Sequence, residues 1–151
     1  MKKISVIGSG TMGNGIAHCF AQHGIEVNLI DINLENLDKA RIKINTNLDR
    51  MIQKNIITEL EKKEIISKIK YNTDFDRNVQ KSDLVIEAVT ESKNIKTNIF
   101  KELDKLCDTN TILASNTSSI SIKEIGDCTK RKDKVIGMHF MNPVPIMKLV
   151  E

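Results

Sequence analysis

The sequence predicts an α/β fold in which helices cover both faces of a mostly parallel sheet. Short β-branched segments, such as residues 2–7, alternate with longer segments whose apolar residues recur at helical spacing. Residues 83–89 are apolar almost throughout, as is typical of parallel strands that are buried on both faces. A glycine-rich turn directly follows the first strand and leads into a helix. Together these features predict a doubly wound, Rossmann-type sheet within one domain, residues 1–151.

The first half of the chain contains signals for two strands and three helices. The first helix follows the glycine turn and ends before Gly24, and residues 26–30 form the next strand. Apolar spacing predicts a long helix over about 34–54. Thr58 and Glu61 form a capping box, so another helix begins there and runs to about residue 69. Two consecutive helices interrupt the strand–helix alternation, which predicts an inserted helical hairpin that projects beyond the sheet.

The second half of the chain returns to the alternating pattern. A short strand is possible at 71–73, and clearer strands are expected at 83–89, 111–115 and 134–139. Helices are expected at 93–107 and 121–125. The inner face of the longer one is predicted to carry Ile95, Ile99, Phe100, Leu103 and Leu106. Prolines at 143 and 145 bracket a loop, after which residues 147–151 begin an extended segment.

Composition limits the classes of function. The chain is 40% hydrophobic and 28% charged, as expected of a soluble globular domain, and its net charge of +3 is too small to indicate a nucleic-acid partner. No apolar run approaches the ~20 residues of a membrane span, and the first residues do not resemble a signal peptide. Three cysteines without C-x-x-C spacing indicate reduced thiols, a cytoplasmic location and no metal site.

The glycine turn is a dinucleotide-binding fingerprint in its required strand–turn–helix context. It has the pattern G-x-G-x-x-G and consists of Gly8, Ser9, Gly10, Thr11, Met12 and Gly13. Gly8 permits the tight turn, Gly10 lets the backbone approach a pyrophosphate, and Gly13 lets helix and strand pack closely. The amides at the start of the helix are expected to bind the phosphates.

Asp31 follows the second strand, 18 positions beyond Gly13. A carboxylate at this place suits the ribose hydroxyls of NAD and would repel the 2′-phosphate of NADP. No arginine occurs in residues 32–34, so the sequence favours NAD. The alternative is that Asp31 only caps the next helix, and the two roles are compatible.

Polar residues follow each strand of the predicted sheet, at the edge where ligands of open parallel sheets bind. They are Ser9, Thr11, Asp31, and the residues of 88–91, 116–119 and 139–142. Runs of Ser, Asn and Thr are also common in ordinary turns. His139 is different because a carboxylate, Glu151, lies on the next extended segment. If the chain folds back at residues 143–145, Glu151 can orient the imidazole for general acid–base catalysis.

Four segments resemble the L-3-hydroxyacyl-CoA dehydrogenases, and among them the short-chain (S)-3-hydroxybutyryl-CoA dehydrogenases of butyrate-forming bacteria. These segments are residues 8–13, 87–89, 115–119 and 139–151, and the last is long and specific. The resemblance covers the whole chain. Members of the family usually carry a further all-helical C-terminal domain, which closes over the substrate and forms the dimer. The resemblance therefore implies that residues 1–151 are the NAD-binding domain and that the helical domain is absent from this chain.

The resemblance also implies roles for individual residues. His139 corresponds to the base that exchanges the proton of the 3-hydroxyl, and Glu151 to its partner carboxylate. Ser118 corresponds to the serine that hydrogen-bonds the 3-oxygen, and Asn142 to an asparagine near the thioester and the nicotinamide. Lys54 matches a lysine that contacts the CoA moiety, together with Ser118 and Asn142 on the substrate side. The implied NAD-binding set is Gly8, Ser9, Gly10, Thr11, Met12, Gly13, Asp31, Ala88, Glu91, Lys96, Asn116 and Ser118. One departure is Asn47, where the family often has a serine near CoA.

The expected function is hydride transfer between NAD(H) and a short-chain 3-hydroxyacyl-CoA or acetoacetyl-CoA. The isolated domain is expected to bind NAD and to turn over slowly or not at all. Surface left exposed by the missing domain predicts a dimer or weak homo-oligomer. A non-catalytic NAD-binding module is the alternative, and a dehydrogenase of another 3-hydroxy acid is a third reading.

Overall fold

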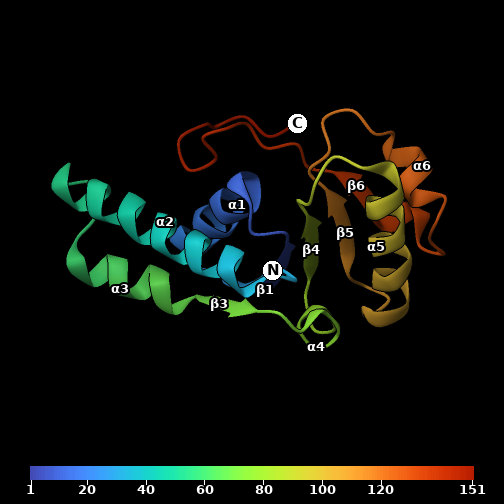
Figure 1. Ribbon diagram of the computed structural model, residues 1–151, viewed down its shortest axis with the longest axis horizontal. Coiled ribbons are helices and arrows are strands. Elements are labelled where there is room, and N and C mark those ends of the chain that lie inside the picture. The colour runs from blue at the N-terminus through green and yellow to red at the C-terminus, as the bar shows by residue number, and fades with distance from the viewer.

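The computed structural model describes residues 1–151, which form one six-stranded sheet with the strand order β3-β2-β1-β4-β5-β6 (Figure 1). Every strand pair is parallel, so the predicted doubly wound fold is confirmed, with a sheet that is entirely parallel. Chain order reverses between β1 and β4, which makes their carboxyl ends the switch point of the sheet. The strands are β1 (Lys3–Ile7), β2 (Glu26–Ile30), β3 (Ile69–Asn72), β4 (Leu84–Glu87), β5 (Ile112–Ser115) and β6 (Val135–Gly137).

Helices cover both faces of the sheet, and a separate apolar cluster lies on each face. They are α1 (Thr11–Gln22), α2 (Leu34–Gln53), α3 (Glu59–Ser67), α4 (Phe75–Val79), α5 (Lys93–Leu106) and α6 (Ile122–Gly126). Side chains of β4 alternate between the clusters: Leu84 and Ile86 pack with α1 and α2, and Val85 packs with α5. Burial on both faces explains why this strand is apolar almost throughout. None of the helices combines the length and the hydropathy that crossing a bilayer requires.

The expected helical hairpin is formed by α2 and α3, which extend side by side beyond the sheet (Figure 1). Its second helix begins with the predicted capping box: Thr58 N donates to Glu61 Oε2 at 2.7 Å, and Glu61 N donates to Thr58 Oγ1 at 3.2 Å. The helix ends at Ser67, two residues earlier than expected. Asn33, rather than Asp31, caps α2, because the Asn33 side chain accepts the amide of Glu35.

One local expectation is wrong, and one short helix was not predicted. Ile95, expected on the inner face of α5, is 44% exposed. The buried face of this helix contains Lys96, Phe100 and Leu103, so it is Lys96 and not its neighbour Ile95 that points inward. The short helix α4 was not expected. It is nucleated by Asp74, whose side chain accepts the amide of Arg77, and it is too short to produce a periodic pattern.

His18 on α1 is a buried histidine whose ring nitrogens lack hydrogen-bond partners. Burial lowers its pKa from 6.5 to about 4, because the charged imidazolium loses its hydration. The unfolded chain therefore binds this proton at a higher pH than the folded chain does. It follows that the stability from keeping His18 neutral is complete above about pH 6.5 and is lost as the pH falls toward 4.

We expect the free energy of unfolding to fall by about 2 kcal/mol between pH 7 and pH 5. Urea denaturation at the two pH values measures this change. The variant His18→Gln should lose most of the pH dependence, whereas His23→Gln, at an exposed position, should retain it. An unchanged pH dependence in His18→Gln would contradict the assignment.

Candidate functional site

The glycine turn holds the start of α1 directly against the end of β1. Gly8 adopts φ +92°, and a Cβ on Gly13 would lie 1.7 Å from the carbonyl oxygen of Gly8. Both positions therefore require glycine. A Cβ on Gly10, in contrast, would have no atom within 4 Å, so the backbone there is open to an approaching group.

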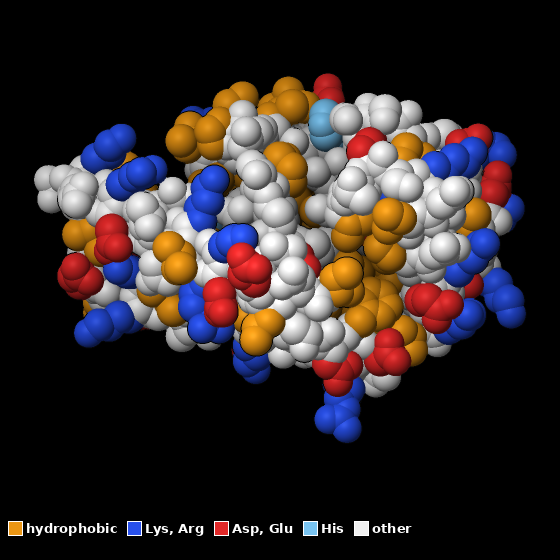
Figure 2. All heavy atoms as spheres, viewed as in Figure 1, with side chains coloured by type: hydrophobic (Ala, Val, Ile, Leu, Met, Phe, Trp, Pro, Cys, Tyr) orange, Lys and Arg blue, Asp and Glu red, His pale blue; other side chains and the backbone are white.

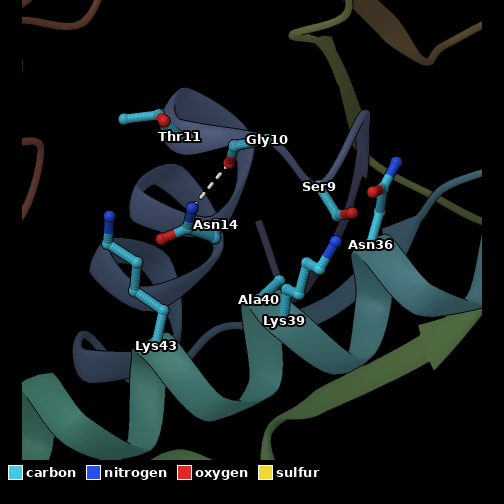
Figure 3. Close-up of a pocket in the computed structure, with 8 residues that line it drawn as sticks. All are labelled: Ser9, Gly10, Thr11, Asn14, Asn36, Lys39, Ala40 and Lys43. Carbon is cyan, nitrogen blue, oxygen red and sulfur yellow. Dashed lines mark hydrogen bonds between the residues drawn. The ribbon is translucent and has the colours of Figure 1, made fainter.

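The first turn of α1 has the free backbone amides that the predicted anion site requires. Gly10 caps this 12-residue helix without a side-chain hydrogen bond, which leaves the first amides available to a ligand. Asn14 donates its Nδ2 to the carbonyl of Gly10 at 2.6 Å and steadies the turn (Figure 3). Open backbone and unused amides fit a pyrophosphate.

Hydrogen bonds to both carboxylate oxygens fix Asp31 beside the glycine turn. Its Oδ2 accepts the backbone N–H and the hydroxyl of Ser9, both at 2.8 Å. Its Oδ1 accepts the amide of Asn33 at 3.0 Å and Asn36 Nδ2 at 3.4 Å. Partial burial raises the pKa of Asp31, but these hydrogen bonds outweigh burial and the net pKa is lowered. The site thus holds a negative charge next to the turn.

A pocket of about 250 Å³ flanks the turn on the side of α2 (Figure 3). One wall of the pocket is formed by the turn residues Ser9, Gly10 and Thr11. The opposite wall is formed by α2 and carries Lys39 and Lys43. A second hollow, of about 300 Å³, continues along α2 past Lys43, Asn47 and Arg50. Positive side chains therefore extend from the turn along the exposed face of α2.

Glu91, after β4, organises the loop that follows β5. Its Oε1 accepts the amides of Ser118 and Ser119, both at 3.2 Å, the hydroxyl of Ser119 at 2.9 Å, and the hydroxyl of Thr117. Desolvation raises the pKa of Glu91, but these bonds and the charge of Lys96 lower it to about 2. The loop is therefore held by an ionised carboxylate. The side chain of Ser118 is exposed at the carboxyl ends of the strands, an edge that we call the rim.

His139 and Glu151 form the predicted pair. Their backbones exchange two hydrogen bonds, of 2.9 and 3.0 Å, and His139 Nδ1 lies 3.0 Å from Glu151 Oε2. The chain folds back between them, as expected, and Val144 of this loop packs against Gly15 of α1. Nδ1 is engaged by the carboxylate, so Nε2 is the ring nitrogen left to exchange a proton with a substrate.

The structure brings most of the predicted residues to one edge of the sheet. Ala88 lies against Gly8 at the switch point and donates its amide to Ile7. Asn116 accepts the amide of Phe140 at 2.9 Å and so joins the Ser118 loop to the His139 segment. Asn142 is exposed on that segment.

Two predicted ligand contacts are not exposed at this edge. Lys54 caps the far end of α2. A helix of 20 residues is about 30 Å long, so Lys54 lies about that far from Leu34, where α2 begins. Lys96 is 1% exposed and lies beneath this edge, where its ammonium contacts Glu87 and Glu91. Sequence reasoning missed Glu87, although a charged residue that ends an apolar strand is a recognisable signal.

The parallel sheet and the glycine turn together define a dinucleotide-binding domain, and a histidine–carboxylate pair lies on the same edge of the sheet. Residues 3–151 match the family model "3-hydroxyacyl-CoA dehydrogenase, NAD binding domain", and the chain belongs to this family of oxidoreductases. The cofactor of the domain is NAD. The family resemblance inferred from the sequence is confirmed.

Relatives and solved structures agree with this assignment. The chain is 49% identical to 3-hydroxybutyryl-CoA dehydrogenase of Clostridioides difficile over 149 residues, which cover 99% of this chain and 53% of that protein. It is 45% identical to a probable 3-hydroxybutyryl-CoA dehydrogenase of Bacillus subtilis, covering 100% and 52%. The crystal structure of (S)-3-hydroxybutyryl-CoA dehydrogenase from Ralstonia eutropha superposes with a TM-score of 0.96 at 43% identity, covering 99% and 53%. The chain thus spans about half the length of the curated relatives it matches.

Two of the three glycines of the turn allow effects on folding and on coenzyme binding to be separated. Gly13→Ala should lower the free energy of unfolding by several kcal/mol or prevent folding, because its methyl group would overlap the Gly8 carbonyl. Gly10→Ala should fold normally and weaken NADH binding at least about 10-fold, because the methyl group enters open space that the phosphates need. Thermal melts and NADH titrations of both variants measure these effects. A Gly10→Ala variant that binds NADH normally would contradict the phosphate site.

Proposed function

We propose that this chain is the coenzyme-binding part of an enzyme that transfers hydride between NAD(H) and C3 of a short-chain 3-hydroxyacyl-CoA. The observation that carries the proposal is the His139–Glu151 pair, at 3.0 Å, on the sheet edge that also carries the glycine turn. A dehydrogenase of this kind needs one proton exchanger beside its coenzyme, and a carboxylate-oriented histidine meets that need.

Each rim residue has a proposed part in the reaction. His139 Nε2 takes the proton of the 3-hydroxyl during oxidation and returns it during reduction. Glu151 orients the ring and stabilises the imidazolium. The hydroxyl of Ser118 hydrogen-bonds the 3-oxygen, and Asn142 lies near the thioester and the nicotinamide. The bound nicotinamide supplies the hydride chemistry itself.

The coenzyme is proposed to lie across the switch point. Its pyrophosphate rests on the first amides of α1, and its adenosine ribose hydrogen-bonds Asp31. The nicotinamide half then extends over Ala88, Glu91, Asn116 and Ser118. The open backbone at Gly10 and the ionised carboxylate at Asp31 support this placement.

A CoA thioester is proposed as the substrate because α2 offers unpaired positive charge to its phosphates. Lys43, Arg50 and Lys54 lie on one side of the helix at spacings of seven and four residues, and none of them forms an ion pair within 4 Å. The carboxylate of Asp49 is instead paired with Lys62 of α3.

A surface near the C-terminal segment supports a further, helical domain in the complete protein, as expected for this family. Ile146, Met147, Leu149 and Val150 are between 43% and 73% exposed. Hydrophobic side chains also gather along the upper edge in Figure 2, where Figure 1 shows this segment. We propose that this surface meets that domain, and that the isolated chain turns over slowly and self-associates through it.

The three cysteines are free, which fits the proposed cytoplasmic location.

A non-catalytic NAD-binding module is the second candidate. The glycine turn and Asp31 serve such a module equally well. It has no need of a histidine–carboxylate pair, so the variants below distinguish the two.

The isolated chain should bind NADH in isothermal titration calorimetry and should bind NADPH at least about 10-fold more weakly. The physical reason is that the fixed charge of Asp31 repels a 2′-phosphate. A well-folded sample that takes up no NADH would refute the coenzyme site, and equal affinity for NADPH would refute the role of Asp31.

Co-expression with the helical C-terminal half of a relative should yield acetoacetyl-CoA-dependent oxidation of NADH. His139→Gln should then lower kcat by about 10²–10⁴-fold, since it removes the proton exchanger, while NADH affinity stays near wild type. Glu151→Gln should lower kcat less, because the imidazole remains. His23→Gln is the matched control. Wild-type kcat in His139→Gln would favour the non-catalytic module.

A further inference from the structure

The segment that carries Glu151 is anchored to the domain by one buried side chain. Within residues 141–151, Val144 is 3% exposed, Met141 and Pro145 are partly buried, and every other residue is exposed. The side chain of Glu151 is itself 62% exposed. The place of this segment on the domain therefore depends on where Val144 sits.

The turn around Val144 is hydrogen-bonded within itself. The carbonyl of Pro143 accepts the amides of Ile146 and Met147, both at 3.0 Å. Because the turn is closed by these bonds, a displacement of Val144 is passed on to the exposed residues that lead to Glu151.

His139, in contrast, is held to the sheet independently of this turn. The residues before and after it donate their backbone amides to the Ser115 carbonyl and to Asn116 Oδ1, both at 2.9 Å. A displacement of Val144 would therefore move Glu151 relative to the histidine, rather than move the two together.

Gly15 of α1 provides the seat of Val144. A Cβ on Gly15 would lie 2.9 Å from Val144 Cβ and 3.0 Å from its Cγ2, inside the ~3.5–4.0 Å at which carbon atoms make contact. Since Cβ is bonded to the backbone, Val144 could not avoid this overlap by a change of rotamer. The φ of Gly15 is not positive, and alanine is more favourable than glycine inside a helix. The close approach of Val144 is therefore the reason for glycine at this position.

We infer that Gly15 is a positioning residue for the proton exchange, which acts through Val144 to hold Glu151 against His139 and takes no part in binding the coenzyme. The inference rests on the proposed function. It gives Gly15 a different task from that of the three glycines of the turn, although all four lie within eight residues of the chain. Removing the seat should disturb the pair and leave the coenzyme site intact.

The test reads the tautomer of His139, because the partner of one ring nitrogen decides which nitrogen carries the proton. In the wild-type chain, ¹⁵N NMR of the neutral imidazole should show the proton on Nδ1, and the signal is assigned by its loss in His139→Gln. Gly15→Ala should raise the share of the Nε2–H form at least about 2-fold, while NADH affinity in calorimetry stays within about 2-fold of wild type. Gly126→Ala is the matched control and should change neither quantity, since a Cβ there would lie at ordinary contact distance, 3.6 Å from Val135 Cβ.

The same variant should affect catalysis only through Glu151. With the helical half of a relative co-expressed, Gly15→Ala should lower kcat about 10-fold and leave the KM for NADH within about 2-fold of wild type. In a Glu151→Gln background, Gly15→Ala should cause no further loss of kcat, because positions that act through one another are not additive.

An unchanged tautomer in Gly15→Ala, a matching loss of NADH affinity, or additive losses of kcat would overturn the inference. If thermal melts show that Gly15→Ala is unfolded, Val144→Ala, which shortens the anchor without an overlap, carries the same comparison with the same expected result. A wild-type chain without a preference for Nδ1–H would overturn the pair, and with it the proposed function and this inference together. A wild-type preference that neither variant alters would overturn this inference alone.

Discussion

The close approach of α1 to β1 is the constraint on which the rest of the site depends. Gly13 lets the helix rest on the Gly8 carbonyl, and this contact sets the height at which its first amides meet the sheet edge. On another side of the same helix, Gly15 admits Val144 from the loop between His139 and Glu151. A single helix therefore locates both its own first amides at the sheet edge and the segment that carries His139.

Three carboxylates at this edge of the sheet have different partners. Asp31 is hydrogen-bonded to the turn it serves, Glu91 holds a neighbouring loop, and Glu151 faces an imidazole. The first two have lowered pKa values because donors surround them, so both remain ionised at neutral pH. Asp31 is hydrogen-bonded to Ser9 and Glu91 to the loop of Ser118, so carboxylates of the same charge hold different parts of the edge.

The sequence predicted the fold and much of the site, because its strongest signals are local. The glycine turn, the capping box at Thr58 and the apolar run of β4 each report a conformation within a few residues. The pairing of His139 with Glu151 was also foreseeable, since two prolines mark the reversal between them. What escaped prediction depends on three-dimensional neighbours. The hydrogen bond between Asn116 and Phe140 and the ion pair between Lys96 and Glu87 are examples. Neither contact produces a periodic pattern in the sequence.

The helix α2 begins beside the glycine turn and is capped at its far end by Lys54, so one rigid rod joins the two proposed ligand regions. Each residue of an α-helix advances about 1.5 Å and turns by about 100°. Adding or deleting one residue within α2 would swing Lys54 around the rod, away from the side that bears Lys43 and Arg50. Insertions close to a multiple of whole helical turns would preserve this phase. The spacing between the two ligands in proteins of this architecture can therefore vary only in coarse steps.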